Sequence, residues 1–386
     1  MKSTAAILIA SCVVAAAAPD SGRHISIEQE LRQAIARGNA WLKAQQKPEG
    51  HWDDEGLPAL TALALTAAVR DPNLDSKAPL PPHVEKGFTW LLAQQKEDGG
   101  IYNRGLSVYN TATSLTALMA ANKTAYEPAA VKARKHLVGA QWDIGEKGKT
   151  DNPNDGGIGY GSKNDHTDLS NTYLAIEALA LSKRLVEDGK YGDQPDLDWE
   201  AAIKFISRCQ NLEETNDQEF ASDDPKNKGG FVYTPDESKA GEDKTADGRT
   251  ALRSYGSMSY AGLLSFIYAK VSADDPRVLA VKEWLAKNYT LEENPGMGTE
   301  GLYYYYQTMA KALTAANIDN LKLENGKEAD WRDQLGRRLL TTQREDGSWV
   351  NSNGRWMESN PILVTAYTVL AMEQLCSSIP KPAGER

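Results

Sequence analysis

Apolar residues at helical spacing, followed by a polar turn, define the clearest structural unit of this chain, residues 87–122. Phe88, Leu91 and Leu92 fall at positions i, i+3 and i+4, which places them on one face of a helix. The polar, glycine-rich segment KEDGG ends that helix and turns the chain. A second helix is expected from about Asn110, because capping hydroxyls precede the apolar run SLTALMAA. The unit is therefore a helical hairpin.

The same hairpin recurs along the chain with variations. Trp41 and Gln46 repeat the spacing of the tryptophan and glutamine in the clearest copy, and a turn and an apolar helix follow them. The other copies cover residues 38–71, 131–182, 199–270, 278–317 and 331–375. A single hairpin of this kind cannot bury its own apolar face, so successive hairpins must stack on their neighbours.

Six hairpins are enough to close into a ring. We therefore predict an all-α fold, an α/α toroid with inner and outer rings of helices. The segments after each turn are poorest in charge and are predicted to be the inner helices, near residues 60, 110, 170, 258, 303 and 362. The turns that lead into them should line the mouth of a central cavity.

The toroid is expected to form one domain over residues 31–376. Tails are predicted at residues 19–30 and 377–386, and a long polar insertion at 211–254. This insertion and a second loop at 145–163 could form a lid over the mouth or a solvated surface.

The first 18 residues have the order of a secretory signal peptide: a lysine, an apolar run and small residues around Ala17 and Ala18. The segment Ile9-Ala10-Ser11-Cys12 also resembles a bacterial lipobox, which would make Cys12 a lipidated N-terminus. We expect a secreted or periplasmic protein, with the lipoprotein as the alternative. No other apolar stretch approaches the ~20 residues that span a bilayer, so no transmembrane segment is expected in the mature chain.

Charge and cysteine content narrow the function classes. The formal net charge is −10 and no run is basic, so nucleic-acid binding is not expected, because phosphates require a basic face. Cys209 and Cys376 remain after signal removal, and either one disulfide or two buried thiols would fit them. Nothing in the chain indicates an oligomeric state.

Three glutamine and aromatic segments carry a family resemblance. Gln45-Gln46 to Trp52, Gln94-Gln95 to Tyr102 and Gln343 to Trp349 resemble the QW motif of squalene–hopene cyclases and related terpenoid cyclases. These enzymes share an α/α toroid with the β subunits of protein prenyltransferases, and the resemblance covers essentially the whole mature chain. In the motif, the glutamine amide caps an adjacent helix end while the aromatic ring stacks between helices. The resemblance implies the architecture and says little about chemistry.

The chemistry of class II terpenoid cyclases rests on a D-x-D-D-T segment, whose clustered carboxylates keep one acid protonated. The best counterpart here is Asp168-Leu169-Ser170-Asn171-Thr172, which has Ser170 and Asn171 where that family has acids. A lone aspartate at a helix N-terminus is pushed toward ionisation, the wrong direction for an acid. Asp165 and His166 lie just upstream and could restore an acid pair. The candidate catalytic residues are therefore Asp165, His166 and Asp168, and whether the chain is an enzyme stays open.

Metal chemistry is not indicated. The prenyltransferases need zinc held by aspartate, cysteine and histidine, and the chain lacks their D-x-C and late-histidine arrangement. The pairs Asp53-Asp54, Asp223-Asp224 and Asp274-Asp275 lack the spacing of the aspartate-rich magnesium motif. We expect no metal and no cofactor.

Several aromatic and acidic residues at the starts of inner helices are candidates for ligand contact. In the run of four tyrosines that begins at Tyr303, successive rings point about 100° apart, so at most two can face the cavity. Such rings could stabilise cations through their π faces, or pack between helices with their hydroxyls bonded to loops. The predicted ligand-binding residues are Tyr255, Tyr260, Glu300, Tyr303, Tyr304, Trp356 and Glu358.

Three functions fit this sequence. The chain could act on or bind an isoprenoid or other small apolar ligand in the central cavity. It could be a secreted carbohydrate-active enzyme, which would need two carboxylates across a groove. It could also be a non-catalytic binding scaffold. Fold alone does not separate them.

Overall fold

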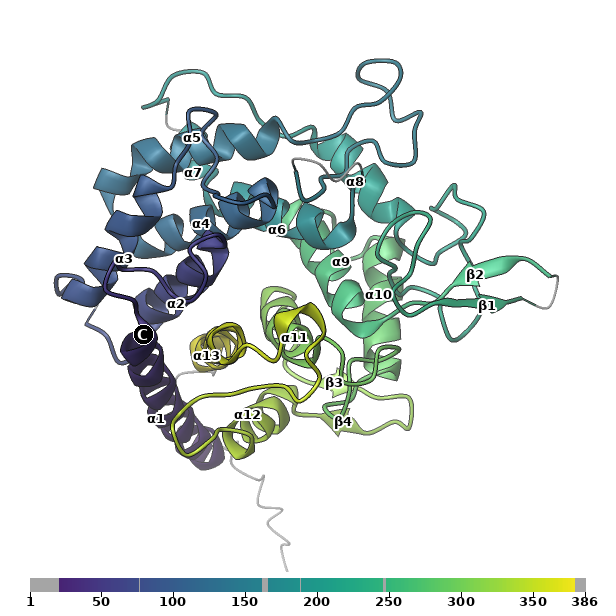
Figure 1. The fold of residues 1–386 in the computed structure, drawn as a ribbon. Helices are drawn as coiled ribbons and strands as arrows, with labels where there is room; N and C mark the ends of the chain where they lie inside the picture. Colours follow the sequence, from purple (N-terminus) through teal and green to yellow (C-terminus); the bar gives the residue numbers. More distant parts are fainter. Residues whose placement is uncertain (1–20, 76, 162–165, 188, 246–247, 379–386) are drawn as a thin grey trace, which may run out of the picture.

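The computed structural model describes residues 21–75, 77–161, 166–187, 189–245 and 248–378. Within these ranges, two rings of helices surround a central axis, one inside the other (Figure 1). The inner helices are α2 (Pro58–Arg70), α4 (Ser107–Ala121), α6 (Leu169–Leu181), α9 (Gly256–Tyr268), α11 (Leu302–Ala315) and α13 (Pro361–Ser378). The outer helices are α1 (Ser21–Gln45), α3 (Pro82–Ala93), α5 (Glu127–Val138), α8 (Trp199–Arg208), α10 (Pro276–Lys287) and α12 (Trp331–Thr341).

The inner ring is closed. Each inner helix packs on the next in chain order, and α13 packs back on α2. The α/α toroid predicted from the repeats is therefore confirmed, and so are the predicted positions of the inner helices.

Proline and aspartate set where many of the helices begin. Proline occupies the first position of α2, α3 and α10, where no backbone N–H is needed. An aspartate side chain caps α6, α8, α10 and α12 by accepting a hydrogen bond from a backbone N–H of the first turn. The starts of these helices are thus fixed by local chemistry, and packing then orients their apolar faces.

A glutamine at the end of an outer helix ties each of five hairpins to the next around the described ring. Its side-chain amide donates to a glycine carbonyl of its own turn and to a carbonyl of the next outer helix or the residue that caps it. The five donor–acceptor pairs across hairpins are Gln46–His83 at 2.8 Å, Gln95–Ala129 at 2.9 Å, Gln141–Asp198 at 2.9 Å, Gln210–Arg277 at 2.9 Å and Gln343–Ala34 at 3.0 Å. The last pair joins the sixth hairpin to the first and closes the outer ring.

In the first two hairpins the glutamine forms a bridge with the residue six positions further along the chain. Gln46 bridges to Trp52 and Gln95 bridges to Ile101. The pairing of Gln95 with Tyr102 that we predicted is therefore wrong by one residue. Tyr102 is half-buried, and its hydroxyl donates a hydrogen bond to Asp98 at 2.8 Å.

The N-terminal tail predicted at residues 19–30 is also corrected, because α1 begins at Ser21. Ile27 and Leu31 are 3 % and 1 % exposed, so this first part of the helix is held by packing against the toroid. The two described cysteines, Cys209 and Cys376, are buried and free, which settles the choice between thiols and a disulfide.

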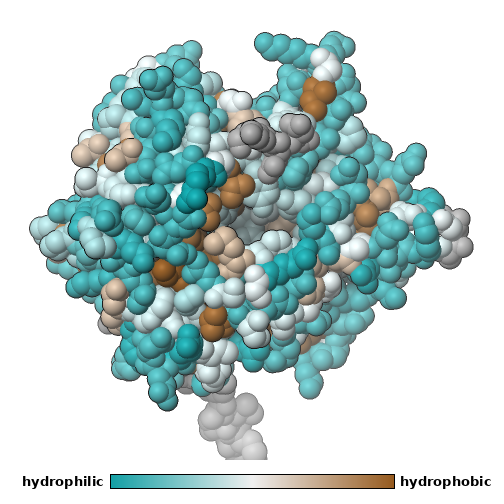
Figure 2. Space-filling model, in the orientation of Figure 1, coloured by the Kyte–Doolittle hydropathy of each residue, from teal (hydrophilic) through white to brown (hydrophobic). Residues whose placement is uncertain are grey.

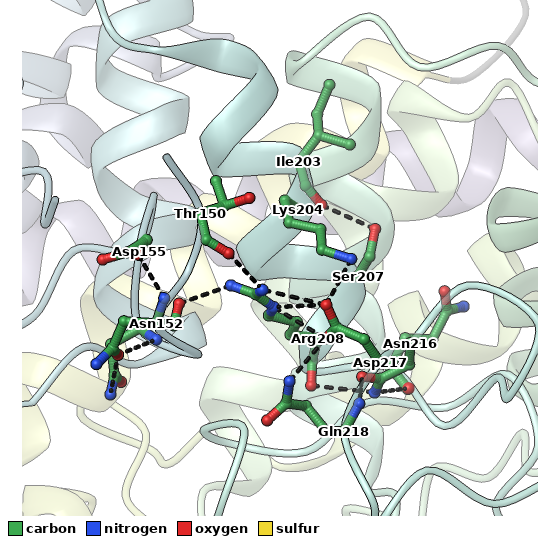
Figure 3. A network of polar contacts seen from close by, with 12 residues as sticks. Thr150, Asn152, Asp155, Ile203, Lys204, Ser207, Arg208, Asn216, Asp217 and Gln218 are labelled. Carbon is green, nitrogen blue, oxygen red and sulfur yellow. Dashed lines mark hydrogen bonds and ion pairs between the residues drawn. The ribbon is translucent and has the colours of Figure 1, made fainter. Parts of the chain in front are cut away.

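Two long loops lie over α8 and are fastened to it by one arginine (Figure 3). Arg208 is 5 % exposed. Its guanidinium donates to the carbonyl oxygens of Thr150 and Asn152, at 2.8 and 2.7 Å, and to the carboxylate of Asp217, at 2.9 Å from Nε. The predicted insertion and the loop before it are thus anchored at this point.

Apart from η2, the minor elements lie at the periphery. The insertion carries the hairpin of β1 (Glu242–Lys244) and β2 (Thr250–Leu252), which projects away from the axis (Figure 1). A second small hairpin pairs β3 (Leu321–Lys322) with β4 (Glu328–Ala329), and α7 (Arg184–Glu187), η1 (Thr124–Tyr126) and η2 (Arg355–Met357) are single turns. Within the described ranges, every helix is too short or too polar to cross a lipid bilayer.

Candidate functional site

A cavity of about 280 Å³ lies where the N-terminal ends of the six inner helices converge. Figure 2 shows this face of the molecule hollowed near its centre, with apolar residues around the hollow and polar residues over the outer rim. Its apolar lining includes Leu57, Leu60, Leu106, Leu174, Met258 and Leu363. The turns that enter the inner helices therefore do line the mouth.

Tyrosines make up much of the remaining wall. They come from three inner helices, from the residue before α9 and from two loops: Tyr109, Tyr160, Tyr233, Tyr255, Tyr304 and Tyr367. The Tyr109 and Tyr367 hydroxyls lie 3.4 Å apart, and the Tyr304 hydroxyl lies 3.4 Å from that of Ser170. The wall is thus aromatic, with a small number of hydroxyl groups that bond to one another.

The rim of the cavity carries two large exposed apolar side chains in a strained segment. Trp356 and Met357 are each 43 % exposed, and their φ values are 52° and 66°, in the left-handed region that bulky residues rarely adopt. The Trp356 ring lies over Gly301, where an added Cβ would come within 3.0 Å of it. Glu300 binds Arg355 at 3.1 Å, and the Arg355 guanidinium lies 5.0 Å from the Trp356 ring centre. These contacts hold Trp356 at the mouth.

Among the described residues that line the cavity, Glu358 is the single carboxylate. It is 1 % exposed and accepts hydrogen bonds from the backbone N–H groups of Tyr303 and Tyr304, at 3.2 and 2.8 Å, and from Asn351 at 2.7 Å. Burial raises the pKa of Glu358, against these donors. Its geometry is that of a cap on the start of α11.

The predicted catalytic residues that the structure describes do not line the cavity, and one of the three lies outside the described residues. Asp165 falls outside the described residues. Asp168 is fully buried and caps α6: its two carboxylate oxygens accept from the backbone N–H and the side-chain amide of Asn171, each at 2.8 Å. The His166 side chain is 47 % exposed, with Nε2 4.0 Å from Asp168 Oδ2. Their catalytic role stays a prediction.

The electrostatics of Asp168 are unusual for a helix cap. Burial raises its pKa to about 6, against the hydrogen bonds from Asn171. Asp168 does not line the cavity, however. Within the segment 168–172, the residue that lines the cavity is Ser170. A ligand in the cavity would therefore meet a hydroxyl where the cyclases have an acid.

Thr172, which matches the threonine of the cyclase segment, has a structural role that other hairpins share. Its hydroxyl accepts a hydrogen bond from the backbone N–H of Ile158, at 2.9 Å. A hydroxyl in the first turns of α2, α4, α9 and α13 accepts the corresponding bond: Trp52 to Thr61, Ile101 to Thr111, Phe231 to Ser259 and Trp349 to Thr365. The presence of Thr172 is therefore explained by the repeat and does not by itself indicate catalysis.

The predicted ligand-binding residues divide into two groups. Tyr255, Tyr304, Trp356 and Glu358 line the cavity. Tyr260, Tyr303 and Glu300 do not: Tyr260 packs on Tyr305, Tyr303 packs on Tyr306, and Glu300 binds Arg355. In the run of four tyrosines, only the Tyr304 ring faces the cavity, because a helix directs neighbouring side chains to different sides.

A larger cleft of about 510 Å³ lies elsewhere, beside α4 and α5, and contains His136 and Asp98. Their side chains are 3.5 Å apart, and the His136 ring lies against Tyr102. His51 and Trp90 make a similar ring contact in the preceding hairpin, so the arrangement belongs to the repeat. Among the residues that the structure places, no group of three or more His, Cys, Asp or Glu could hold a metal ion.

The fold and this cavity together define an α/α toroid protein with an aromatic, apolar central chamber. No family model matches the chain, and no curated protein matches it by sequence. The comparisons with solved structures, in contrast, return several toroids.

The type II terpene cyclase MstE from Scytonema superposes with a TM-score of 0.51 at 15 % identity, over 91 % of this chain and 100 % of that one. Protein geranylgeranyltransferase-I from Candida albicans, complexed with GGPP, gives 0.51 at 14 % identity, over 87 % and 90 %. A family 76 glycoside hydrolase from a bovine Bacteroides thetaiotaomicron strain gives 0.57 at 12 % identity, over 90 % and 78 %. The chain therefore has the terpenoid cyclase-like toroid fold.

Proposed function

We propose that this protein binds an isoprenoid or other small apolar ligand in the central cavity and does not protonate it. The proposal rests on the cavity wall, where leucines, two methionines and six tyrosines surround the space. Its described charged groups are Lys239, which is paired with Glu237, and Glu358, which is held by three N–H donors. Mostly apolar pockets with a few polar groups are typical of small-molecule sites.

The wall also argues against acid catalysis on an alkene. The position that would present an acid to the ligand carries Ser170, and Asp168 is turned toward Asn171. MstE is described in complex with geranylgeranyl dihydroxybenzoate, so a related toroid accepts a prenylated ligand. This chain would retain binding of such ligands without the acid.

The size of the cavity limits what fits. At about 280 Å³ it lies near the lower end of the range of about 300–1,000 Å³ for ligand pockets. A short isoprenoid would fill it. A longer chain would leave through the mouth, across the exposed surfaces of Trp356 and Met357.

A glycan-processing function has the support of the glycoside hydrolase fold, but the chamber is poorly suited to it. Glycosidases need two carboxylates roughly 5–10 Å apart across the substrate. The described lining offers Glu358 alone, buried as a helix cap. We therefore place binding of an apolar ligand first.

The test is direct binding to the purified protein. Native mass spectrometry after incubation with lipid extract should show retained apolar compounds, and farnesol should bind in a titration. Ser170→Phe should abolish binding by filling the cavity, whereas Ser352→Phe, at an exposed serine on the mouth loop that does not line it, should bind as the wild type does. Equal binding by wild type and Ser170→Phe, or retention of oligosaccharides in place of apolar compounds, would overturn the proposal.

A further inference from the structure

A second, polar chamber lies directly beneath the apolar cavity. It has a volume of about 30 Å³ and shares Tyr109, Leu174, Tyr304 and Tyr367 with the cavity above. Its other walls come from later turns of the same inner helices and include Thr66, Thr113, Glu177, Gln307 and Lys311. The two spaces therefore follow one another along the inner helices, and tyrosines separate them.

One wall of this chamber is a neutral ion pair. Lys311 Nζ lies 2.8 and 2.9 Å from the two carboxylate oxygens of Glu177. The hydroxyls of Tyr173 and Tyr268 also donate to Glu177, at 3.1 and 3.3 Å. The negative charge of Glu177 is thus neutralised by Lys311 within the protein.

Two other polar groups of the chamber have no such partners. Gln307 is 5 % exposed and lines the chamber, but its side-chain amide makes no hydrogen bond with any residue that the structure describes. Arg70, the last residue of α2, also lines it and forms no hydrogen bond or ion pair within the described ranges. Buried polar groups almost always have a partner, so the Gln307 amide points to a group that occupies the chamber. Arg70 is half-buried and borders the same space.

The charge of the chamber favours an anion. Lys311 neutralises Glu177, which leaves the positive charge of Arg70. The nearby Glu373 is buried, with no hydrogen-bond partner for either oxygen among the described residues. Burial raises the pKa of Glu373 well above its usual range, which favours the uncharged form of this side chain.

The volume limits the anion to a small group. A buried water needs roughly 10–15 Å³ of cavity volume measured in this way. The chamber of about 30 Å³ therefore has room for about two oxygen atoms, as in a carboxylate. A guanidinium binds a carboxylate through strong, charge-assisted hydrogen bonds, and a glutamine amide can add another.

We propose that this chamber binds the carboxylate head of an amphiphilic ligand whose apolar chain fills the cavity above, with Arg70 and Gln307 as the head-group contacts. This inference rests on the proposed function and names its ligand class, an isoprenoid or similar apolar carboxylic acid. The chain would pass between Tyr109 and Tyr367, whose hydroxyls are 3.4 Å apart, and rotation of either ring opens that passage. Selectivity for an acid over an alcohol would then come from the lower chamber, because Lys239, the cation that lines the cavity above, is paired with Glu237 at 2.6 Å.

The experiment compares farnesol with farnesoic acid, which differ only at the head group, in titrations of the full chain at neutral pH. The wild type should bind the acid about tenfold or more tightly than the alcohol, the size expected for hydrogen bonds to a charged group. Arg70→Met should remove this preference and keep binding of the alcohol within about threefold. Arg344→Met, at an exposed arginine of the outer surface, is the matched control and should keep the preference.

Gln307→Glu gives a second variant, in case Arg70→Met does not fold. Its negative charge should weaken the acid about tenfold and leave the alcohol nearly unchanged. Equal binding of acid and alcohol by the wild type, or a preference that survives in both variants, would overturn this inference and leave the proposed function standing. Failure of both ligands to bind would refute the two together. Acetate is the remaining arm: if it binds as tightly as farnesoic acid, the chamber serves a free anion and the amphiphile is excluded.

Discussion

The hydroxyls of Ser170 and Tyr304 lie 3.4 Å apart in the cavity wall. Among the described residues that line the cavity, the single carboxylate is Glu358. Ser170 stands at the position where the terpenoid cyclases have an acid. The proposal that this toroid binds its ligand without protonating it rests on this pair.

Ser170→Asp should place an acid against Tyr304 inside the apolar cavity. Burial would raise the pKa of the new carboxyl, so it would be neutral in mild acid and charged in mild base. We expect the variant to bind farnesol about tenfold more weakly at pH 8 than at pH 5, with little change for the wild type. Titrations at the two pH values measure this, with Ser170→Asn as the uncharged control of similar size. Binding by Ser170→Asp that does not change with pH would show that the side chain does not face the ligand.

Asp168→Asn should stabilise the protein at neutral pH. The pKa of Asp168 is raised to about 6 by burial, so folding favours its protonated form. The stability that this group contributes is present below its unfolded pKa near 4 and is lost as the pH rises through about 6; a shift of about two pKa units corresponds to about 3 kcal/mol. Asparagine is also a good helix cap, and its amide can donate to Asn171 Oδ1, which has no described partner.

Urea unfolding at pH 4 and pH 7.5 tests this sign. The variant should exceed the wild type in free energy of unfolding at pH 7.5, and the difference should shrink toward pH 4. A variant that is less stable than the wild type at pH 7.5 would mean that Asp168 is ionised and held by its hydrogen bonds.

Gln343→Ala should weaken the ring at its closure. The Gln343 amide donates to Ala34 at 3.0 Å and to Gly347 at 3.0 Å, and Ala34 is fully buried. Loss of a donor to a buried carbonyl costs about 1–3 kcal/mol. The free energy of unfolding in urea should fall by about that amount, while Gln45→Ala, at a glutamine without this role, should change it little. An effect no larger than that of Gln45→Ala would show that packing of α13 against α1 and α2 closes the ring without this bond.

Arg208→Met should release the two loops that cover α8. The substitution leaves the carbonyls of Thr150 and Asn152 without their donor and Asp217 without its main partner. We expect a loss of about 2–3 kcal/mol, less than for a fully buried pair because water screens Asp217, whose side chain is 42 % exposed. Limited proteolysis should then cut within residues 143–157 or 213–228.

Lys204→Met is the control for this clamp. Lys204 also binds Asp217, at 2.7 Å, but its side chain is 35 % exposed, so its loss should cost below about 1 kcal/mol and leave the loops resistant. If Lys204→Met is cut as fast as Arg208→Met, the anchoring of the loops depends on Asp217 and not on Arg208.

The repeats in the sequence were sufficient to predict the toroid, because each hairpin carries one apolar face that only neighbours can cover. The predicted positions of individual aromatic side chains were less accurate, because they require the hairpins to be aligned residue by residue. Tyr102 was paired with Gln95, although the six-residue spacing of Gln46 and Trp52 points to Ile101. Tyr260 and Tyr303 were assigned to the cavity, but helical geometry turns both away from it: Tyr260 packs on Tyr305 of α11, and Tyr303 packs on Tyr306 of its own helix.

The same comparison between hairpins would have found tyrosines that the sequence analysis missed. The backbone N–H groups of Ile158 and Phe231 donate to a hydroxyl in the first turn of an inner helix. Tyr160 and Tyr233 each lie two residues after one of these donors. Tyr109 and Tyr367 lie two residues from the hydroxyls of their own helices. The lower chamber could not be predicted, because Arg70 and Gln307 meet only through the closure of the ring.

That closure has a consequence for the order of the hairpins along the chain. The helix that begins the described chain, α1, packs on α12 and α13, which end it, so the two ends of the fold lie side by side. A covalent link between them, with new ends cut at the exposed Asn122 between α4 and α5, would keep every inner helix beside its present neighbours. Such circular permutants should still enclose the same chamber, because it is defined by adjacency around the axis and not by which hairpin is synthesised first.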